Sequence, residues 1–405
     1  MIRIGVLSDI HFGENAREDA TELRLPTEKI GGATQNICDG AVEIMKKMNV
    51  NYIFLAGDQT SFGSPEEFYY CEKKVHEMAK KVGVEQKHVL WCVGNHDNDW
   101  SITKIFHERY KDVAPEIKEI AKAKYSQISA SVARENTVNH PKFTDEGPLP
   151  INGVYEDAEM IVFVLNSSSK CTEHKVIEHG ELTGLQLAWL KERLESYGQD
   201  NRWKIVMLHH HPFNYSYPMI AHDISFLSEG SEFCDLVGEN GVNLVVHGHR
   251  HHPRCITERQ TNWEFPVTFI CSGSFSVGVE QRNKGEIPNC FHIIELSDTV
   301  GELKLFSYEY SMASGWRKVK EYREELPIDG EMYLGKMFDS SVTDNAIEKL
   351  FSFGGNYHVW KWNELEEPLL YMRSNLLEEK IKHSKWYNRY EIKISHLENI
   401  MIIKK

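Results

Sequence analysis

Short apolar runs recur along the first three quarters of the chain, and most of them end abruptly in polar or charged residues. Runs of this length that are bounded by turn-forming residues predict buried β-strands. The runs of this kind are Ile2–Ser8, Tyr52–Ala56, His88–Val93, Met160–Leu165, Trp203–Leu208 and Val242–Val246. Three later segments, Val267–Cys271, Cys290–Leu296 and Glu302–Tyr310, are also predicted strands, the last two being antiparallel across a turn.

Between these runs, apolar residues recur at helical spacing. The predicted helices are Ile37–Met48, Ser64–Val82, Leu182–Leu194 and Glu232–Glu239. The second has a clear start, because Ser64 is suited to cap it, Pro65 takes its first position and Glu67 completes a capping box. Strands that alternate with helices predict an α/β protein.

The chain divides into a large first part and a smaller second part. After about Ser311, 15 basic residues balance 15 acidic ones and aromatic residues are frequent. We therefore predict a catalytic domain over 1–310 and a small appended domain, an accessory unit or a cap, over 311–405. The polar segment Phe12–Gly32 is predicted to be a surface loop or a substrate-facing rim, and Trp100–Pro150 to be an insertion.

Five of the predicted strands end in residues that bind metal ions. These residues are Asp9 and His11, Asp58, Asn95, His210, and the pair His249 and His251. Residues i and i+2 of an extended segment point the same way, so Asp9 and His11 can converge on one ion. All seven side chains offer oxygen or imidazole nitrogen, which favours Mn, Fe, Zn or Co over Ca or Mg. One carboxylate bridging through both oxygens would suit two metal ions about 4 Å apart.

These motifs, Asp-x-His, Gly-Asp, Gly-Asn-His-Asp, His and Gly-His-x-His, stand in the order found in a known family. Over residues 1 to about 310 the sequence resembles the calcineurin-like metallophosphoesterases, which implies a four-layer α/β/β/α sandwich. The resemblance implies that Asp58 bridges two metals, with Asp9, His11 and His251 on one and Asn95, His210 and His249 on the other. It also implies that His96 protonates the leaving oxygen or steadies the transition state, and that Asp97 orients His96. His209 remains the alternative to His210, because three histidines stand in a row.

Composition narrows the expected partners. The chain has 46 basic and 60 acidic residues, a formal charge of −14, which argues against a protein that coats nucleic acid. No apolar run approaches membrane length, the first residues do not read as a signal peptide, and the eight cysteines include no C-x-x-C pair. We therefore expect a cytoplasmic protein with reduced thiols, whose oligomeric state the sequence leaves open.

The expected reaction follows from the charge of the metals. Two metal ions would neutralise the phosphoryl oxygens and lower the pKa of a shared, bridging water, so that hydroxide attacks phosphorus in line. The leading hypothesis is hydrolysis of a small, nucleotide-like phosphodiester or phosphomonoester. The alternatives are a DNA nuclease of the same family, which net acidity disfavours, and a non-catalytic regulatory protein on the same fold, which would have a broken ligand set.

Overall fold

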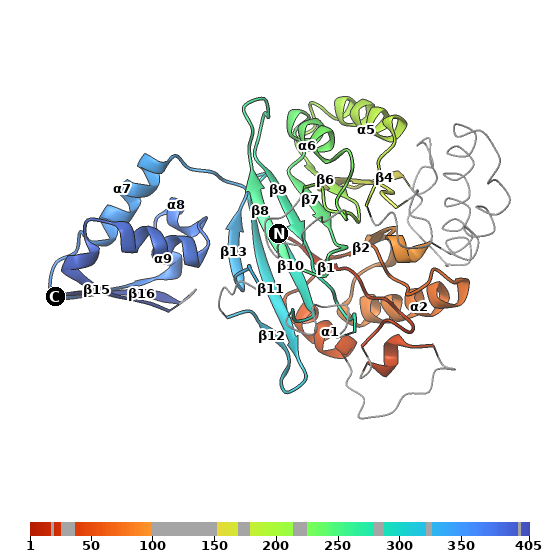
Figure 1. The fold of residues 1–405 in the computed structure, drawn as a ribbon, viewed down its shortest axis with the longest axis horizontal. Coiled ribbons are helices and arrows are strands. Elements are labelled where there is room, and N and C mark those ends of the chain that lie inside the picture. Colours follow the sequence, from red (N-terminus) through yellow and green to blue (C-terminus); the bar gives the residue numbers. More distant parts are fainter. Residues whose placement is uncertain are drawn as a thin grey trace.

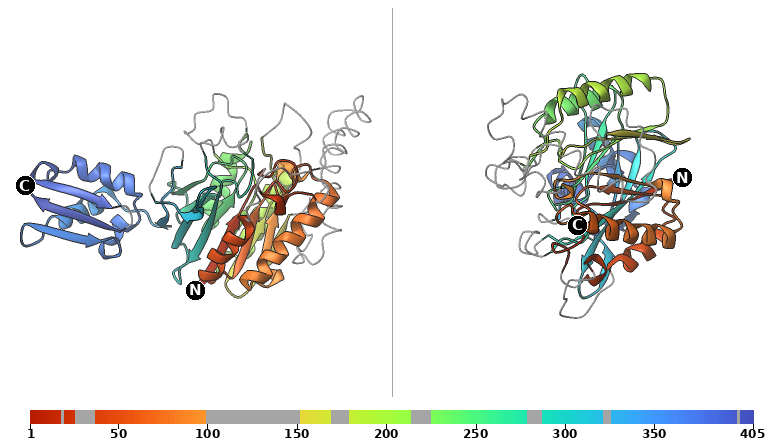
Figure 2. Two further views of the ribbon diagram at one scale, coloured as in Figure 1. Left: turned by 90° about the horizontal axis from the view of Figure 1, so that it is seen from below. Right: turned by 90° about the vertical axis from the view of Figure 1, so that its right-hand side faces the viewer.

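The computed structural model describes residues 1–17, 20–25, 37–98, 152–168, 179–213, 225–278, 287–320, 326–395 and 398–405. Two mixed β-sheets face each other, and helices cover the outer face of each (Figures 1 and 2). This is the predicted α/β/β/α sandwich. Among the described residues, no helix combines the length and apolar character needed to cross a membrane. The predicted insertion Trp100–Pro150 lies outside the described residues.

The first sheet has the order β12-β11-β10-β1-β2-β3, and β13 also pairs with β11. Its strands are β1 (Ile2–Leu7), β2 (Tyr52–Ala56), β3 (Val89–Cys92), β10 (Cys290–Leu296), β11 (Leu303–Ser311), β12 (Gly315–Lys318) and β13 (Glu331–Leu334). Strands β1, β2 and β3 are parallel, whereas β10 runs antiparallel to β1 and to β11. Helices α1 (Ile37–Lys47) and α2 (Pro65–Val82) pack on its outer face (Figure 1).

The second sheet has the order β4-β5-β6-β7-β9-β8. Its strands are β4 (Gly153–Glu156), β5 (Met160–Val164), β6 (Trp203–Met207), β7 (Leu244–His247), β8 (Arg254–Glu258) and β9 (Val267–Cys271). Helices α5 (Gly184–Ser196) and α6 (Gly230–Glu239) cover it (Figure 1). The sequence pattern missed β4 and β8, which are short and incompletely buried.

Each sheet buries both of its faces, so the apolar core lies in separate layers between the sheets and under the helices. Successive strand residues point to opposite faces and therefore belong to different layers. In β6, Ile205 and Met207 pack between the sheets, whereas Val206 and the following Leu208 pack under the helices. The caps fix where the helices begin. Ser64 Oγ accepts from the backbone N–H of Glu67 at 3.2 Å, and the Glu67 carboxylate accepts from Ser64 N at 3.3 Å, which confirms the predicted capping box.

Short 3-10 turns complete the catalytic part, at η1 (Thr21–Leu23), η2 (Gln86–His88) and η3 (Asn95–Asp97). The segment after β1 is packed rather than loose, because Phe12, Ala16, Ala20 and Leu23 are all buried against the α1–α2 side of the first sheet. The expectation of a surface loop is therefore wrong for residues 12–17 and 20–25.

The C-terminal residues form a unit with its own sheet, ordered β14-β16-β15, and its own apolar core (Figures 1 and 2). Its elements are α7 (Ser340–Leu350), β14 (Tyr357–Lys361), η6 (Trp362–Glu364), α8 (Glu367–Leu370), α9 (Ser374–His383), η7 (Tyr387–Arg389), β15 (Tyr390–Ser395) and β16 (Asn399–Lys404). The predicted boundary at residue 310 falls inside β11, and both β12 and β13 pair with that strand. We propose that the boundary lies instead between Leu334 and Ser340.

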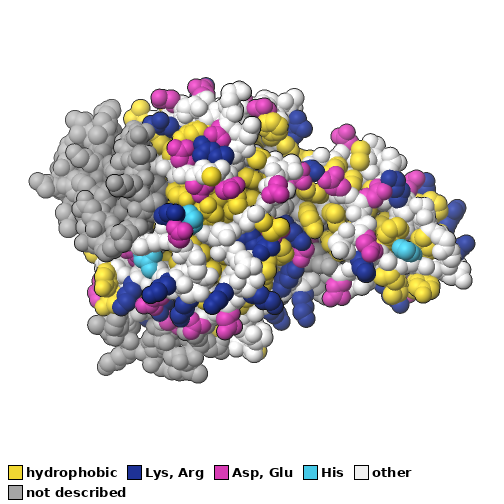
Figure 3. Space-filling model, turned by 180° about the vertical axis from the view of Figure 1, so that it is seen from behind, with side chains coloured by type: hydrophobic (Ala, Val, Ile, Leu, Met, Phe, Trp, Pro, Cys, Tyr) yellow, Lys and Arg dark blue, Asp and Glu magenta, His cyan; other side chains and the backbone are white. Residues whose placement is uncertain are grey.

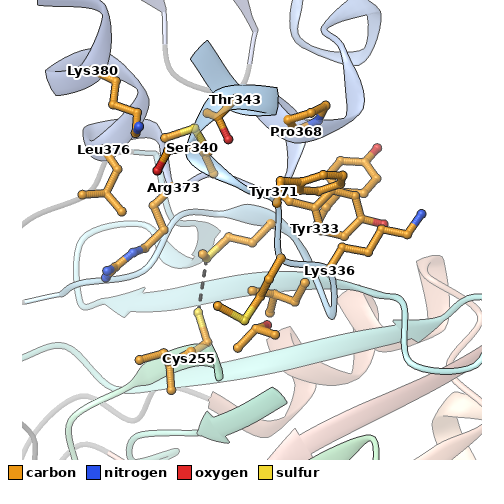
Figure 4. Close-up of a pocket in the computed structure, with 17 residues that line it drawn as sticks. Cys255, Tyr333, Lys336, Ser340, Thr343, Pro368, Tyr371, Arg373, Leu376 and Lys380 are labelled. Atoms are coloured by element: carbon orange, nitrogen blue, oxygen red, sulfur yellow. Dashed lines mark hydrogen bonds between the residues drawn. The ribbon is translucent and has the colours of Figure 1, made fainter. Parts of the chain in front are cut away.

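The C-terminal unit is held to the catalytic part by polar contacts. The buried Asp329 carboxylate accepts from Ser374 N at 2.9 Å and from Ser374 Oγ at 2.6 Å, at the start of α9. Glu302 accepts from Tyr371 Oη at 2.9 Å and pairs with Lys336 at 3.0 Å. A cavity of about 350 Å³ remains at this junction, between β8, β13 and the C-terminal helices (Figure 4).

Candidate metal centre

The predicted ligands meet where the carboxyl ends of parallel strands from both sheets come together. Asp9 and His11 follow β1, Asp58 follows β2 and Asn95 follows β3, so these four residues come from the first sheet. His249 and His251 follow β7 of the second sheet. The two sheets therefore supply complementary parts of one site, as ligand sites at the carboxyl ends of strands commonly do.

One group contains Asp9, His11, Asp58 and His251. His11 Nε2 and His251 Nε2 lie 3.2 Å apart, and His251 Nε2 lies 3.3 Å from Asp9 Oδ1. His11 Nε2 is 3.6 Å from Asp58 Oδ2. Two imidazole nitrogens and two carboxylate oxygens thus point at a common centre, which suits one metal ion.

The second group contains Asp58, His209 and His249. His209 Nε2 lies 3.2 Å from Asp58 Oδ2 and 3.3 Å from His249 Nδ1. Asn95 Oδ1 joins this group, at 2.9 Å from His249 Nδ1. The same Asp58 oxygen, Oδ2, faces both groups, while Oδ1 accepts a 2.8 Å hydrogen bond from His96 N. Asp58 is therefore the residue that both groups share.

The structure brings His209, and not the predicted His210, within ligand distance of Asp58. The His210 ring packs beside the His249 ring, at 4.3 Å between centroids. His210 Nδ1 instead lies 2.9 Å from Ser167 Oγ, and its ring packs against Gly180. The reason is the alternation of β6 described above, which carries past the strand end. Position 209 continues the side of Ile205 and Met207, between the sheets, whereas position 210 continues the side of Val206 and Leu208.

A family model described as calcineurin-like phosphoesterase matches residues 2–253, well over half of the chain. The chain belongs to this family. It is a metal-dependent phosphoesterase, as the resemblance implied, and its two groups of residues that could hold metal ions share one aspartate. Among curated proteins, none matches the sequence.

Solved structures that resemble this phosphoesterase are distant in sequence. A purple acid phosphatase from yellow lupin (Lupinus luteus) seeds is 11% identical with a TM-score of 0.48, over 78% of this chain and 52% of that one. A dimetal phosphatase from Danio rerio is 11% identical with a TM-score of 0.46, over 83% and 99%. A putative 5'-nucleotidase from Staphylococcus aureus is 12% identical with a TM-score of 0.39, over 98% and 61%. The phosphoesterase thus spans about half the length of the lupin protein.

The backbone of the phosphoesterase is strained at its ligands. Five of the six described non-glycine residues with positive φ are predicted ligands, namely Asp9, His11, Asp58, His249 and His251, with φ between 49° and 77°. Such a conformation costs about 1 kcal/mol or more per residue and persists only where the surrounding structure imposes it. Its concentration here indicates that the fold holds these side chains in place for binding.

The glycines of the motifs are required by close packing. A Cβ atom on Gly94 would lie 2.1 Å from Asp58 Oδ1, and one on Gly248 would lie 2.6 Å from Asp9 Oδ2. A Cβ atom on Gly57 would lie 2.3 Å from His209 Nδ1. Each motif glycine therefore leaves room for a ligand that belongs to another strand.

Electrostatics favour cations at this site. Burial lowers the pKa of His11 and of His249 well below the usual range, so these imidazoles are neutral and can act as ligands. Burial opposes ionisation of Asp58, yet His209 and His96 hold its pKa well below the usual value. Asp9 Oδ1 and His11 Nδ1 are buried, and no described residue forms a hydrogen bond with either atom. Burial also opposes protonation of His209, but Asp58 raises the pKa of His209 to about 9, so a metal ion would have to replace that proton. Buried carboxylates beside the neutral imidazoles of His11 and His249 fit a metal centre.

His96 and Asp97 have separate roles in the geometry. His96 Nδ1 donates to the Ser61 carbonyl at 2.8 Å, and its ring lies edge-on to His11 at 4.6 Å between centroids. The buried Asp97 carboxylate accepts from Gln59 N, Thr60 N and Thr60 Oγ1 through Oδ1, and from Gly94 N through Oδ2. The Ser61 carbonyl contacts the His96 ring, and the Thr60 hydroxyl, which donates to Asp97 Oδ1 at 3.0 Å, also lies 3.1 Å from the His96 carbonyl oxygen. Asp97 ties the loop after β2 to the loop after β3.

Proposed function

We propose that this phosphoesterase hydrolyses a small phosphodiester or phosphomonoester of nucleotide size. The observation that carries the proposal is the shared Asp58 Oδ2, which faces His11 on one side and His209 on the other. Two ions held by these residues would act on a single phosphoryl group.

The residues present fit two transition-metal ions, for which we propose Mn, Fe or Zn. Asp9, His11, Asp58 and His251 would hold one ion, and Asp58, Asn95, His209 and His249 the other. When bound, the ions supply Lewis acidity that neutralises phosphoryl oxygens and makes water nucleophilic near neutral pH. Mixed nitrogen and oxygen donors suit these metals better than Ca or Mg.

His96 is the proposed proton donor. Because Nδ1 donates to the Ser61 carbonyl, a proton for transfer would be carried on Nε2. Proton transfer from Nε2 to the leaving oxygen would stabilise the transition state without contributing to metal binding. The backbone N–H of the same residue holds Asp58 Oδ1, so one short loop supports both the ligand and the donor.

A small substrate is favoured by the distribution of cations. Arg17 is 6% exposed. It donates to Asn289 Oδ1 at 2.9 Å, and its guanidinium group lies over the Tyr310 ring. It is therefore committed to the interior. On the face shown in Figure 3, Lys and Arg side chains lie among Asp and Glu side chains. A polynucleotide needs several cations aligned along its phosphates.

The test is a hydrolysis panel with Mn-loaded protein. Cyclic nucleotides, nucleoside phosphates, phospholipid head groups and single-stranded DNA would be compared at low and high salt. We expect turnover of a nucleotide-sized ester with weak salt dependence. Efficient degradation of DNA that falls steeply with salt would replace this proposal with the nuclease.

Matched variants separate metal binding from proton transfer. Asp58→Ala is expected to lose bound metal together with activity, whereas His96→Ala is expected to retain metal and lose turnover. His383→Ala, at an exposed position on α9, is the control and should behave as the wild type. Full metal occupancy in Asp58→Ala would refute the shared-ligand assignment.

We further propose that the protein works in the cytoplasm. The seven described cysteines are free thiols, and all are buried. Thiols in this state are typical of reducing compartments. Fractionation of the source cells with an antibody would test the location, and recovery with secreted proteins would contradict it.

A further inference from the structure

His210 lies beside the candidate metal centre, although it is not among the residues that face Asp58. Its side chain is fully buried, and its ring lies 4.3 Å from the His249 ring between centroids, with 49° between the two planes. The rings of His209 and His211 lie farther from His249, at 5.0 and 6.0 Å. Among these three consecutive histidines, His210 is therefore the nearest neighbour of a candidate ligand.

The ring of His249 lacks the hydrogen bond that usually orients a metal ligand. A histidine that binds a metal ion usually donates its other ring N–H to a carbonyl or carboxylate, which fixes the plane of the ring. His209 has such a contact, because its Nδ1 donates to the Ala56 carbonyl at 2.8 Å while Nε2 faces Asp58.

In His249, by contrast, Nδ1 faces the ligand group, at 2.9 Å from Asn95 Oδ1 and 3.3 Å from His209 Nε2. No described residue forms a hydrogen bond with His249 Nε2, the atom that would carry the orienting contact. The orientation of this ring therefore depends on the side chains packed against it.

The ring of His210 is itself held on two sides. Ser167 Oγ accepts from His210 N at 3.2 Å and lies 2.9 Å from His210 Nδ1, to which it can donate its own proton. Gly180 packs against the same ring, because a Cβ atom on Gly180 would lie 2.4 Å from His210 Cγ. Ser167 and Gly180 therefore leave the His210 ring little freedom to turn.

The two supports of His210 are fixed by backbone hydrogen bonds. Glu181 N donates to the Ser167 carbonyl at 3.0 Å, and Gly180 N donates to the Phe226 carbonyl at 3.2 Å. Ser167 follows β5 and His210 follows β6, and these strands are parallel neighbours, as β6 and β7 are. Because His249 follows β7, the residues that hold His210 belong to the same sheet as the ligand beside it.

We propose that His210 is a positioning residue that holds the ring of His249 in the orientation in which it binds a metal ion. The inference rests on the ligand set proposed above, in which His249 holds the second ion. A bound ligand ring has to adopt one orientation, and a neighbour that already imposes it lowers the entropy cost of binding. Without the His210 ring, His249 would have to be ordered by the ion itself.

The experiment is isothermal titration of the metal-free protein with Mn²⁺. The wild type is expected to bind two ions. His210→Ala should weaken one of them about tenfold or more, which is the usual effect of removing a residue that orients a ligand. The other ion should be unaffected, because the group of Asp9, His11, Asp58 and His251 does not include His249. His383→Ala, at an exposed position on α9, is the control and should bind both ions as the wild type does.

Two further variants test whether packing of the ring is responsible. His210→Phe keeps a ring beside His249 and should restore most of the lost affinity. Ser167→Ala leaves the His210 ring in place but removes its hydrogen-bond partner, so it should weaken the same ion by less than His210→Ala does. Ser167→Ala also provides the test if His210→Ala does not fold.

Crystal structures of the metal-free wild type and of His210→Ala give a readout that does not depend on binding. The His249 ring should turn or adopt mixed orientations in the variant, whereas His209 should keep its hydrogen bond to the Ala56 carbonyl. The proposal is overturned if His210→Ala binds both ions as tightly as the wild type, if His210→Phe is as weak as His210→Ala, or if the His249 ring does not move.

His249→Ala separates this inference from the ligand set on which it rests. Loss of one ion in His249→Ala supports the ligand set, and unchanged affinity in His210→Ala would then overturn the positioning role alone. Binding of two ions to His249→Ala with wild-type affinity would overturn the ligand set, and the positioning role with it.

Discussion

Gly94→Ala tests whether the spacing of the two loops positions the shared ligand. The backbone at Gly94 has φ −98° and ψ 178°, which alanine adopts without strain. The added Cβ atom, however, would lie 2.1 Å from Asp58 Oδ1 and 2.2 Å from Asp58 N. Only space, and not backbone conformation, opposes this substitution.

The magnitude follows from these distances. Non-bonded heavy atoms favour separations of about 3.5 Å, so the two loops must move apart by about 1 Å or more. A displacement of about 1 Å at a catalytic group typically costs about 100-fold in rate. We therefore expect kcat/KM to fall about 100-fold, with overpacking lowering the free energy of unfolding by about 1–3 kcal/mol.

The assay combines steady-state hydrolysis of bis(p-nitrophenyl) phosphate with metal analysis of the same preparation. Gly184→Ala is the control, because its Cβ atom would meet no other atom within 4 Å at the exposed start of α5. That variant should retain full activity and gain up to about 1 kcal/mol of stability. Wild-type turnover and metal content in Gly94→Ala would refute the steric reasoning.

Three other predictions concern stability. Asp97→Asn should lower the free energy of unfolding in urea by about 1–3 kcal/mol, because the new amide cannot accept from every donor that faces Asp97; an unchanged midpoint would contradict this. Burial lowers the pKa of His292 to about 4, so the unfolded chain binds this proton more readily and stability should fall as pH drops from about 6.5 to 4, by roughly 3 kcal/mol. His292→Gln should flatten that part of the pH profile, and an equally steep profile would count against it. Asp329→Ala should lower stability by about 1–2 kcal/mol and speed proteolysis of the C-terminal unit, since it removes the carboxylate that accepts from Ser374 at the start of α9; unchanged cleavage would exclude this role.

Local signals in the sequence were sufficient to predict most helices and strands of residues 1–310 and most of the candidate metal ligands. The capping box at Ser64 and Glu67 fixed the start of α2, because the interaction is complete within four residues. Apolar runs that end in Asp9, Asp58 and Asn95 predicted strands with ligands at one edge of a sheet. Each of these inferences needs only the period of a helix or strand and the chemistry of its terminal residues.

The tertiary structure decided which way each side chain faces and which residues it contacts. The run His209-His210-His211 contains the same side chain three times, so only the orientation of β6 between the sheets and the helices selects His209. The role of Asp97 likewise depended on which loop packs beside it, because its partners Gln59 and Thr60 are almost forty residues away.

Tertiary structure also decided where the boundary between the catalytic part and the C-terminal unit lies. Strands β12 and β13 belong to the first sheet because they pair with β11, and the short, incompletely buried runs of both give no sequence sign of that pairing. The sequence by itself therefore determined most of the elements in residues 1–310, the α/β class and the chemistry of the metal ligands, which are local properties. The packing of segments far apart in the chain decided which of those side chains meet.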